Sequence, residues 1–340
     1  NQVNAQKVAL VLSGGAAKGI AHVGVIKALE ENNIPIDYIV GTSMGSVVGG
    51  CYVAGYSAEQ IDSLITSSNF QKWVQGDIHL ENNFYFNAAD GGPSWINLDF
   101  SIDSLFSSSI NSTLVSDLAI NFVLAERFSK QSEVANYNFD NLFVPFRAVT
   151  SDIFTQSSEA IDSGSLASAV RASFSAPQFY RPIKVNNKYL FDGGIYNNFP
   201  VDVAKKEFNP DVIIGVNVSD KIFDTYPFGK DDELINDALI YAVLDKSEPS
   251  QIDSTGVYIQ PNLAGFSPLN FSKPQAMIDS GYQETMRKMS EIKSKIERRM
   301  PTYQLIDSRA SFKAKEKPYV FKSIEMHNFT NRQKIFIERA

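Results

Sequence analysis

A serine between two glycines is the first candidate for chemistry. Ser43 lies at the centre of Gly41-Thr42-Ser43-Met44-Gly45, a G-x-S-x-G pattern between an apolar strand-like run and an apolar helix-like stretch. This order is typical of a nucleophile elbow, a sharp strand-to-helix turn that exposes the serine oxygen. The start of the following helix adds partial positive charge near a developing anion. The alternative is an ordinary turn in which Ser43 caps the helix.

A loop of small residues precedes the first helix-like stretch. It has the sequence Gly14-Gly15-Ala16-Ala17-Lys18-Gly19. In such a loop, backbone N–H groups can converge on one point and bind an anion or an oxyanion. Two other loop types fit poorly. A P-loop has Lys and then Ser or Thr after its second glycine, whereas Ile20 follows Gly19. A dinucleotide fingerprint has glycine where Ala16 stands and an acidic residue where the second strand ends in Val40-Gly41. A tight turn without a ligand is the remaining alternative.

An aspartate follows a short strand-like run further along the chain. Asp192 comes directly after residues 189–191 and before Gly193 and Gly194. Open α/β sheets place their ligand sites at the carboxyl ends of strands. Asp192 is therefore a candidate to accept the proton of Ser43. The alternative is a turn aspartate that bonds its own backbone.

Histidines and cysteines are too scarce for several other kinds of site. His22, His79 and His327 lie outside the three motifs, so a Ser-Asp dyad fits better than a Ser-His-Asp triad. We expect each histidine to be structural or at the surface. Cys51 is the single cysteine, which excludes an intramolecular disulfide and a multi-cysteine zinc site. We therefore expect no metal and no cofactor.

The composition is that of a globular protein. The 340 residues are 44% hydrophobic and 20% charged, with 31 Lys and Arg against 38 Asp and Glu and a net charge of −7. An acidic balance argues against nucleic acid as a partner, because phosphates are bound by basic surfaces. No apolar run approaches the roughly 20 residues of a membrane span. No signal-peptide pattern opens the chain, and we expect that any such segment has been removed.

Strand-like and helix-like segments alternate along much of the chain. Apolar runs predict strands at residues 8–12, 38–40, 143–150, 189–191 and 212–218. Helical periodicity predicts helices at residues 19–31, 44–55 and 166–172. This alternation predicts an α/β fold with a mostly parallel sheet and right-handed crossovers.

Two regions depart from the alternation. Residues 70–140 contain a partly alternating aromatic stretch, a Gly-Gly-Pro turn at 91–93 and a helical stretch at 112–128, so we predict an inserted β-hairpin and helix that cover the ligand edge of the sheet. Residues 283–300 predict a helix with an apolar face toward the core, and a helix on a membrane surface is the alternative. A polar linker is expected around Lys313, Lys315 and Lys317.

The three motifs, in this order, resemble the patatin-like phospholipase family over about residues 7–218. The segment Ser173–Pro182 resembles the family's stretch before its aspartate. The resemblance implies a three-layer α/β/α patatin-like fold over residues 1–310, with a mostly parallel central sheet. It implies that Ser43 is the nucleophile, that Asp192 is the proton acceptor and that residues 14–19 form the oxyanion loop. Ala16 departs from the family's three consecutive glycines and is strained if the loop needs a positive φ there.

The same resemblance implies an activity and a substrate class. A serine acyl hydrolase of this family attacks phospholipids or other lipid esters through an acyl-enzyme, here on Ser43, without a cofactor. One alternative is a catalytically weak or inactive lipid-binding passenger domain. Another is transfer of the acyl group to an acceptor other than water.

The end of the chain carries a second, shorter resemblance. Residues 319–339 resemble the start of a POTRA module. In a bacterial branch of the family, such a module follows the patatin domain and precedes an outer-membrane barrel. We therefore expect the start of a truncated POTRA-like module at residues 318–340. We also expect a membrane-associated full-length protein in the bacterial cell envelope, and we consider a homodimer.

Overall fold

The computed structural model describes residues 6–76, 115–177, 179–219 and 249–318, with residues 330, 331, 334 and 335. The expected β-hairpin of the insertion, His79 and His327 lie outside the described residues, as does almost all of the expected POTRA-like module. Those expectations therefore stay predictions.

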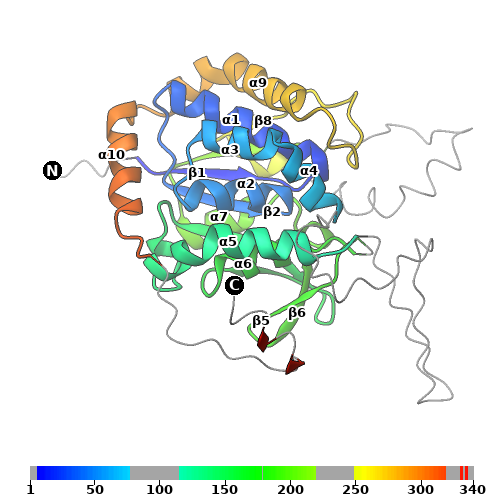
Figure 1. Ribbon diagram of the computed structural model, residues 1–340. Coiled ribbons are helices and arrows are strands. Elements are labelled where there is room, and N and C mark those ends of the chain that lie inside the picture. The colour runs from blue at the N-terminus through cyan, green and yellow to red at the C-terminus, as the bar shows by residue number, and fades with distance from the viewer. Residues whose placement is uncertain are drawn as a thin grey trace, which may run out of the picture.

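Strands and helices alternate through most of the described chain (Figure 1). The strands are β1 Val8–Leu12, β2 Tyr38–Thr42, β3 Phe146–Asp152, β4 Ser157–Ile161, β5 Ile183–Val185, β6 Lys188–Asp192, β7 Val212–Val216 and β8 Val257–Ile259. The α-helices are α1 Ala21–Glu31, α2 Met44–Val53, α3 Ala58–Thr66, α4 Ser68–Gln75, α5 Leu118–Val134, α6 Leu166–Ser173, α7 Val201–Phe208, α9 Pro274–Lys295 and α10 Thr302–Lys313. Short 3₁₀ turns include η1 Ala16–Ile20 and η4 Gly193–Ile195.

The strands form one sheet in the order β5-β6-β3-β2-β1-β7-β8, with β4 also paired to β3. Neighbouring strands are parallel along the run β3-β2-β1-β7-β8. The pairs β3–β4, β3–β6 and β5–β6 are antiparallel. The prediction of a mostly parallel α/β sheet is therefore confirmed. Parallel strands are joined by helical crossovers, so their carboxyl ends meet at one edge, where ligand sites form.

The pairing of β3 explains how two distant segments meet at that edge. β4 lies along one side of residues 148–152, and β2 lies along the other side of residues 146–149. β6 pairs with Thr150 and Ser151, whose other side is taken by β4. β6 therefore lies on the same side of β3 as β2, just beyond the point where β2 ends. The end of β6 therefore faces the end of β2.

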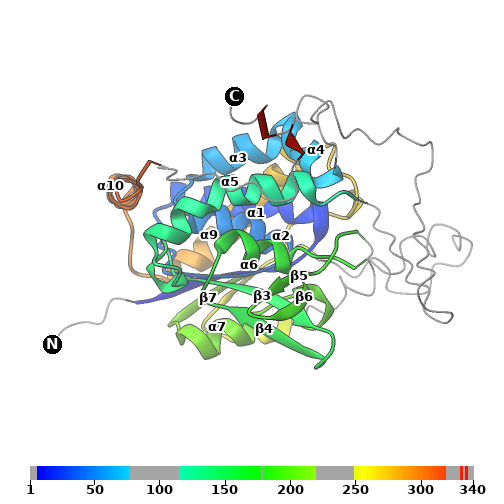
Figure 2. The ribbon, with the colours of Figure 1, turned by 60° about the horizontal axis from the view of Figure 1, so that its bottom comes forward.

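The sheet has helices on both faces (Figure 2). Alternate residues of β1 show the division: Leu10 and Leu12 belong to the larger apolar core under α1, α2, α3, α5 and α6, whereas Ala9 and Val11 belong to a smaller core under α7. This arrangement confirms the predicted three-layer α/β/α architecture. The helix α9 packs along the outer side of α1. Within the described part of the chain, no helix is both long and apolar enough to span a bilayer.

Several predicted boundaries were wrong, each for a physical reason. β2 continues to Thr42 because its last residues pair with Ala148 and Val149 of β3, although glycine is a poor strand former. α5 runs from 118 to 134, six residues later than predicted. The short strands β4, β5 and β8 were missed because they lack a long apolar run.

The region after residue 270 differs most from expectation. α9 begins at Pro274, nine residues earlier than predicted, and ends at Lys295. Met289, Ile292 and Ile296 are buried, so the core-facing interpretation is confirmed for most of the predicted stripe, whereas Met286 is exposed. Lys313 is the last residue of α10, so the linker that we expected there is partly helical.

Candidate active site

Ser43 lies at the turn between β2 and α2, in a conformation that non-glycine residues rarely adopt. Its φ is 52° and its ψ is −124°. Its side chain makes no capping hydrogen bond to α2, so the alternative of an ordinary N-cap is wrong. Only 8% of the residue is exposed. The turn has the strained strand-to-helix geometry of a nucleophile elbow, and such strain persists only where surrounding contacts hold it.

The glycines of the motif let the elbow pack against the first strand. A β-carbon added at Gly45 would lie 2.4 Å from the Leu12 carbonyl oxygen, and one added at Gly41 would lie 2.6 Å from the Gly45 carbonyl oxygen. Both neighbours are backbone atoms, which cannot rotate away as a side chain can. The G-x-S-x-G spacing therefore allows α2 to start directly over the end of β1.

The Ser43 hydroxyl donates a hydrogen bond of 2.6 Å to Oδ2 of Asp192. Asp192 is the last residue of β6 and is almost completely buried. Its other oxygen, Oδ1, accepts the N–H of Gly194 at 2.8 Å, so the residue also makes the turn contact considered from the sequence. Burial raises the pKa of Asp192 from 3.8 to about 6, although its hydrogen bonds with Ser43 and Gly194 oppose that rise.

Gly193 and the segment after it join Asp192 to the neighbouring strands. A β-carbon at Gly193 would lie 2.3 Å from the Val149 carbonyl oxygen, so only glycine fits between Asp192 and β3. The Thr42 hydroxyl donates to the carbonyl of Asn197 at 2.9 Å. The short stretch after Asp192 thus also contacts the residue before Ser43.

The end of α6 supports both members of the pair, which the sequence motifs did not indicate. The Ser43 N–H donates to the hydroxyl of Ser173 at 3.0 Å, and that hydroxyl donates to the carbonyl of Val149 at 2.6 Å. The Asp192 N–H donates to the carbonyl of Ser175 at 3.0 Å. Arg171 is buried and donates to the Ser175 hydroxyl at 2.6 Å. The only sequence signal for Ser173 and Ser175 was the family resemblance of residues 173–182, and Arg171 lies outside that stretch.

The glycine-rich loop lies against Ser43. A β-carbon at Gly14 would lie 3.1 Å from that of Ser43. The N–H groups of Gly14, Ala17 and Lys18 donate to the carbonyls of Asn198, Pro268 and Gly15, respectively. Gly19 packs against Met44 at the start of α2.

Two N–H groups of the loop are left for a ligand. Those of Gly15 and Ala16 have no acceptor among the residues that the structure describes, as expected at the start of a helical turn. Ala16 has a φ of 47°, so the strain expected of an alanine at this position is present.

His22 is turned to a structural contact. Its Nε2 lies 2.8 Å from the carbonyl oxygen of Ser13, and burial lowers its pKa to about 4. The ring is therefore neutral at physiological pH and braces the strand before the loop. This matches the expectation that His22 is structural.

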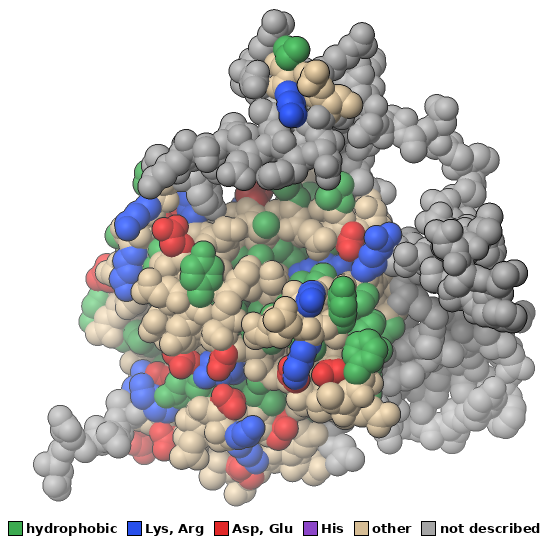
Figure 3. Space-filling model, turned by 90° about the horizontal axis from the view of Figure 1, so that it is seen from below, with side chains coloured by type: hydrophobic (Ala, Val, Ile, Leu, Met, Phe, Trp, Pro, Cys, Tyr) green, Lys and Arg blue, Asp and Glu red, His purple; other side chains and the backbone are tan. Residues whose placement is uncertain are grey.

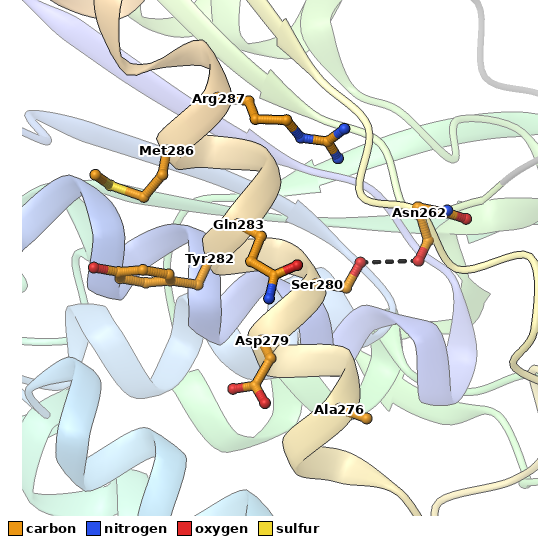
Figure 4. A pocket seen from close by; sticks show the side chains of 8 residues that line it. All are labelled: Asn262, Ala276, Asp279, Ser280, Tyr282, Gln283, Met286 and Arg287. Carbon is orange, nitrogen blue, oxygen red and sulfur yellow. Dashed lines mark hydrogen bonds between the residues drawn. The ribbon is translucent and has the colours of Figure 1, made fainter.

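No other group of side chains competes with this site in the described part of the chain. There, no three His, Cys, Asp or Glu residues gather as metal ligands would. A surface hollow of about 870 Å³ lies along α9 (Figure 4). Its side chains do not converge: Tyr282 and Met286 point to one side of the helix and Arg287 to the other.

Comparison with known proteins gives three results. Residues 10–205 match the family model described as Patatin-like phospholipase. Patatin-like phospholipase domain-containing protein 6 of Mus musculus is 26% identical over 302 residues, which is 81% of this chain and 20% of that protein. Lysophospholipase NTE1 of Kluyveromyces lactis is 26% identical over 309 residues, which is 82% of this chain and 19% of that protein.

The solved structure of VipD from Legionella pneumophila aligns with 84% of this chain and 67% of its own, with a TM-score of 0.41 and 13% identity. The chain spans about a fifth of the length of the two curated relatives it was compared with above.

Proposed function

The chain belongs to the patatin-like phospholipase family, and we propose that it is a serine acyl hydrolase of lipid esters in which Ser43 and Asp192 are the catalytic dyad. The observation that carries this proposal is the 2.6 Å hydrogen bond from the Ser43 hydroxyl to the buried Asp192 carboxylate. The names of the relatives, phospholipase and lysophospholipase, support glycerophospholipids as the substrate class.

The acylation half of the reaction follows from this geometry. The Asp192 carboxylate accepts the Ser43 proton while the serine oxygen attacks the ester carbonyl carbon. When the tetrahedral intermediate collapses, the bond from carbon to the leaving oxygen breaks, and Asp192 returns the proton to that oxygen. The products are the released alcohol and an acyl ester on Ser43. A pKa of about 6 keeps Asp192 ionised at neutral pH yet basic enough to take a proton.

The tetrahedral intermediate carries a negative oxygen that needs donors. The unoccupied N–H groups of Gly15 and Ala16 are suited to this role, because the loop that holds them lies against Ser43. The Ser43 N–H is already donated to Ser173, so it does not contribute. Each donor of this kind is worth about 2.7–4 kcal/mol of transition-state stabilisation in comparable enzymes.

Deacylation uses the same base. Asp192 accepts a proton from water, whose oxygen attacks the acyl carbon, and then returns the proton to the oxygen of Ser43. The free fatty acid leaves. If another alcohol replaces water in this step, the enzyme is an acyltransferase, and the dyad geometry is the same for both outcomes.

A lipid-binding domain with little activity is the second candidate. The observation in its favour is Ala16, whose positive φ strains one of the two proposed donors. The two candidates differ in whether Ser43 is reactive.

A fluorophosphonate probe and defined phospholipids test the proposal. We expect one adduct on Ser43, and fatty acid release from phosphatidylcholine that carries different acyl chains at its two positions. Ser43→Ala abolishes both, and Ser308→Ala, at an exposed serine of α10, is the matched control. An intact Ser43 that neither reacts with the probe nor supports lipid turnover in folded protein would establish the second candidate.

We also propose that the full-length protein acts at a membrane of the bacterial cell envelope, and that it forms a homodimer. Both proposals rest on the family resemblance alone. Fractionation of cells and light scattering of the purified chain test them separately.

A further inference from the structure

Three large apolar side chains are exposed together beyond the carboxyl end of β3. Ile153 and Phe154 form the tip of the β3–β4 hairpin, and Tyr189 lies on β6. Their exposed fractions are 37%, 74% and 53%. In the antiparallel pairing of β3 with β6, Thr150 lies opposite Asp192 and Ser151 lies opposite Phe191. Continued in this register, Tyr189 lies beside the hairpin tip. We call these three residues the apolar tip.

Basic side chains accompany the apolar tip. Residues 181–189 include Arg181, Lys184 and Lys188 and no acidic residue, in a chain whose net charge is −7. All three are exposed. The Lys184 ammonium lies 5.9 Å from the centre of the Tyr189 ring. Figure 3, which views the molecule from the side of β5 and β6, shows hydrophobic and basic side chains next to one another right of centre.

Contacts of Asp152 and Lys188 hold the backbone around the apolar tip in place. The N–H groups of Phe154 and Thr155 donate to Oδ1 of Asp152, at 2.9 and 3.2 Å. Lys188 forms ion pairs with Asp152 and Glu159, so it ties β6 to both strands of the neighbouring hairpin. The backbone that carries Phe154 is therefore held in place, and its side chain is 74% exposed. A pre-formed apolar projection loses little conformational entropy on binding.

The tip is close to the proposed catalytic base. Tyr189 precedes Asp192 by three residues on the same strand, which corresponds to about 10 Å along β6. The tip therefore lies at the same carboxyl edge of the sheet as Asp192. Phe and Tyr rings beside Lys and Arg are the combination that favours the boundary between acyl chains and anionic headgroups.

We propose that the apolar tip, with Arg181 and Lys184, docks this chain on an anionic lipid bilayer and positions the dyad over the bilayer surface. The proposal rests on the lipid hydrolase function proposed above and names the surface that meets the aggregated substrate. Phe154 and Tyr189 enter the headgroup region, and the two cations contact lipid phosphates. Lys188 is engaged with acidic neighbours and acts as a structural tie.

Vesicle binding measured without turnover tests the docking. Ser43→Ala serves as the background, with sedimentation on vesicles of equal parts phosphatidylglycerol and phosphatidylcholine. We expect binding that weakens as salt is added and that is much weaker on pure phosphatidylcholine. Phe154→Ala lowers the partition coefficient about tenfold, because an exposed ring no longer enters the lipid. Lys184→Glu lowers it by more than about fivefold on anionic vesicles only.

Matched variants on distant surfaces separate docking from general apolar or charge effects. Tyr303 is 64% exposed on α10, a helix that lies well away from β5 and β6 in both ribbon views (Figures 1 and 2). We expect Tyr303→Ala and Lys315→Glu, at an exposed lysine just after α10, to bind vesicles as the background does. Phe154→Trp restores binding, and its emission shifts to shorter wavelength when vesicles are added.

A soluble short-chain ester distinguishes failure of docking from failure of the dyad. In the active protein, Phe154→Ala and Lys184→Glu retain full turnover of this ester and lose most turnover of vesicle phospholipid. Equal vesicle binding by Phe154→Ala and the background would overturn the docking surface and leave the dyad intact. Absence of ester turnover in the unsubstituted protein, with vesicle binding preserved, would overturn the dyad and leave the docking surface intact.

Discussion

The backbone N–H of Ser43 donates to the side-chain hydroxyl of Ser173, which lies 130 positions later in the chain. The same hydroxyl donates to the carbonyl of Val149, so it bridges the elbow and β3. This contact fixes the strained φ of Ser43 from outside its own turn. It also occupies the N–H of Ser43, which is therefore not open to a further acceptor.

Ser173→Ala should lower turnover more than substrate binding. Its loss leaves the buried Ser43 N–H and Val149 carbonyl without this partner, which costs about 1–3 kcal/mol in unfolding free energy. We expect kcat on a soluble ester to fall about tenfold or more with KM little changed, because the elbow relaxes. Ser168→Ala, on the same helix, is the control. Ser173→Thr keeps a hydroxyl and should restore most of kcat. A normal kcat in Ser173→Ala would show that the turn at Ser43 keeps its conformation without the Ser173 hydroxyl.

The two residues of the proposed dyad could be picked out as candidates because their signals are local. A serine between glycines at a strand-to-helix junction, and an aspartate followed by two glycines at a strand end, need only a few neighbouring positions to be recognised. Ser173 and Asn197 were not predictable as supports, because their contacts depend on which side of β3 each strand takes. No short stretch of sequence carries that information.

Ala16→Gly should stabilise the fold without loss of activity. Ala16 holds a φ of 47°, which disfavours a β-carbon, whereas glycine adopts it freely. The gain is offset by the greater freedom of glycine in the unfolded chain, so we expect a net increase of at most about 1 kcal/mol in unfolding free energy. Denaturant titration measures it.

The control for this prediction is Asn186→Gly. Asn186 has a φ of 49° in the exposed turn between β5 and β6, and asparagine tolerates such values. A smaller change is expected there. If Ala16→Gly lowers the unfolding free energy by as much as an alanine-to-glycine substitution at a position with negative φ, then Ala16 is not strained.

Gly45→Ala should prevent α2 from packing over β1. The added methyl group would lie 2.4 Å from the Leu12 carbonyl oxygen and 2.6 Å from that of Ser13. Backbone must shift to accommodate it, so we expect a loss of about 2 kcal/mol or more in unfolding free energy, together with loss of turnover. In Gly265→Ala the methyl group would meet no atom within 4 Å, and we expect a change within about 0.5 kcal/mol. Equal effects of the two substitutions would contradict this account of the motif.

The helical region after residue 270 shows a different limit of sequence analysis. Residues 274–282 belong to α9, but they include polar residues and Gly281 and carry no clear apolar stripe. Their helix forms because it packs along α1, a tertiary contact that overrides weak local preference. α10 was missed for the same reason, since it is anchored mainly by Arg309 and Phe312.

The pH profile of turnover should report the ionisation of Asp192. In the proposed mechanism the carboxylate form is the base, and burial raises the pKa of this group to about 6. We expect kcat/KM on a soluble ester to rise about tenfold per pH unit below that value and to level off above it. The rate of fluorophosphonate labelling should follow the same curve. A midpoint near 7 that moves on substitution of His22 would instead indicate a histidine base.

Asp192→Asn should increase stability while it abolishes turnover. The carboxyl group titrates at 3.8 when unfolded and at about 6 when folded, so between these values the native state binds more protons. The unfolding free energy contributed by Asp192 therefore falls as pH rises through this window, by at most about 3 kcal/mol. Asparagine carries no charge to bury, so the variant avoids this loss.

We expect Asp192→Asn to be more stable than the parent by about 1–3 kcal/mol above pH ~6.5 and equal to it below pH ~4. His22, whose pKa is lowered to about 4, has the opposite pH dependence, but it is present in both proteins and cancels in the difference. Urea unfolding of the two proteins across this range measures the difference. A stability difference that does not change with pH would mean that Asp192 is not held above its ordinary pKa by burial.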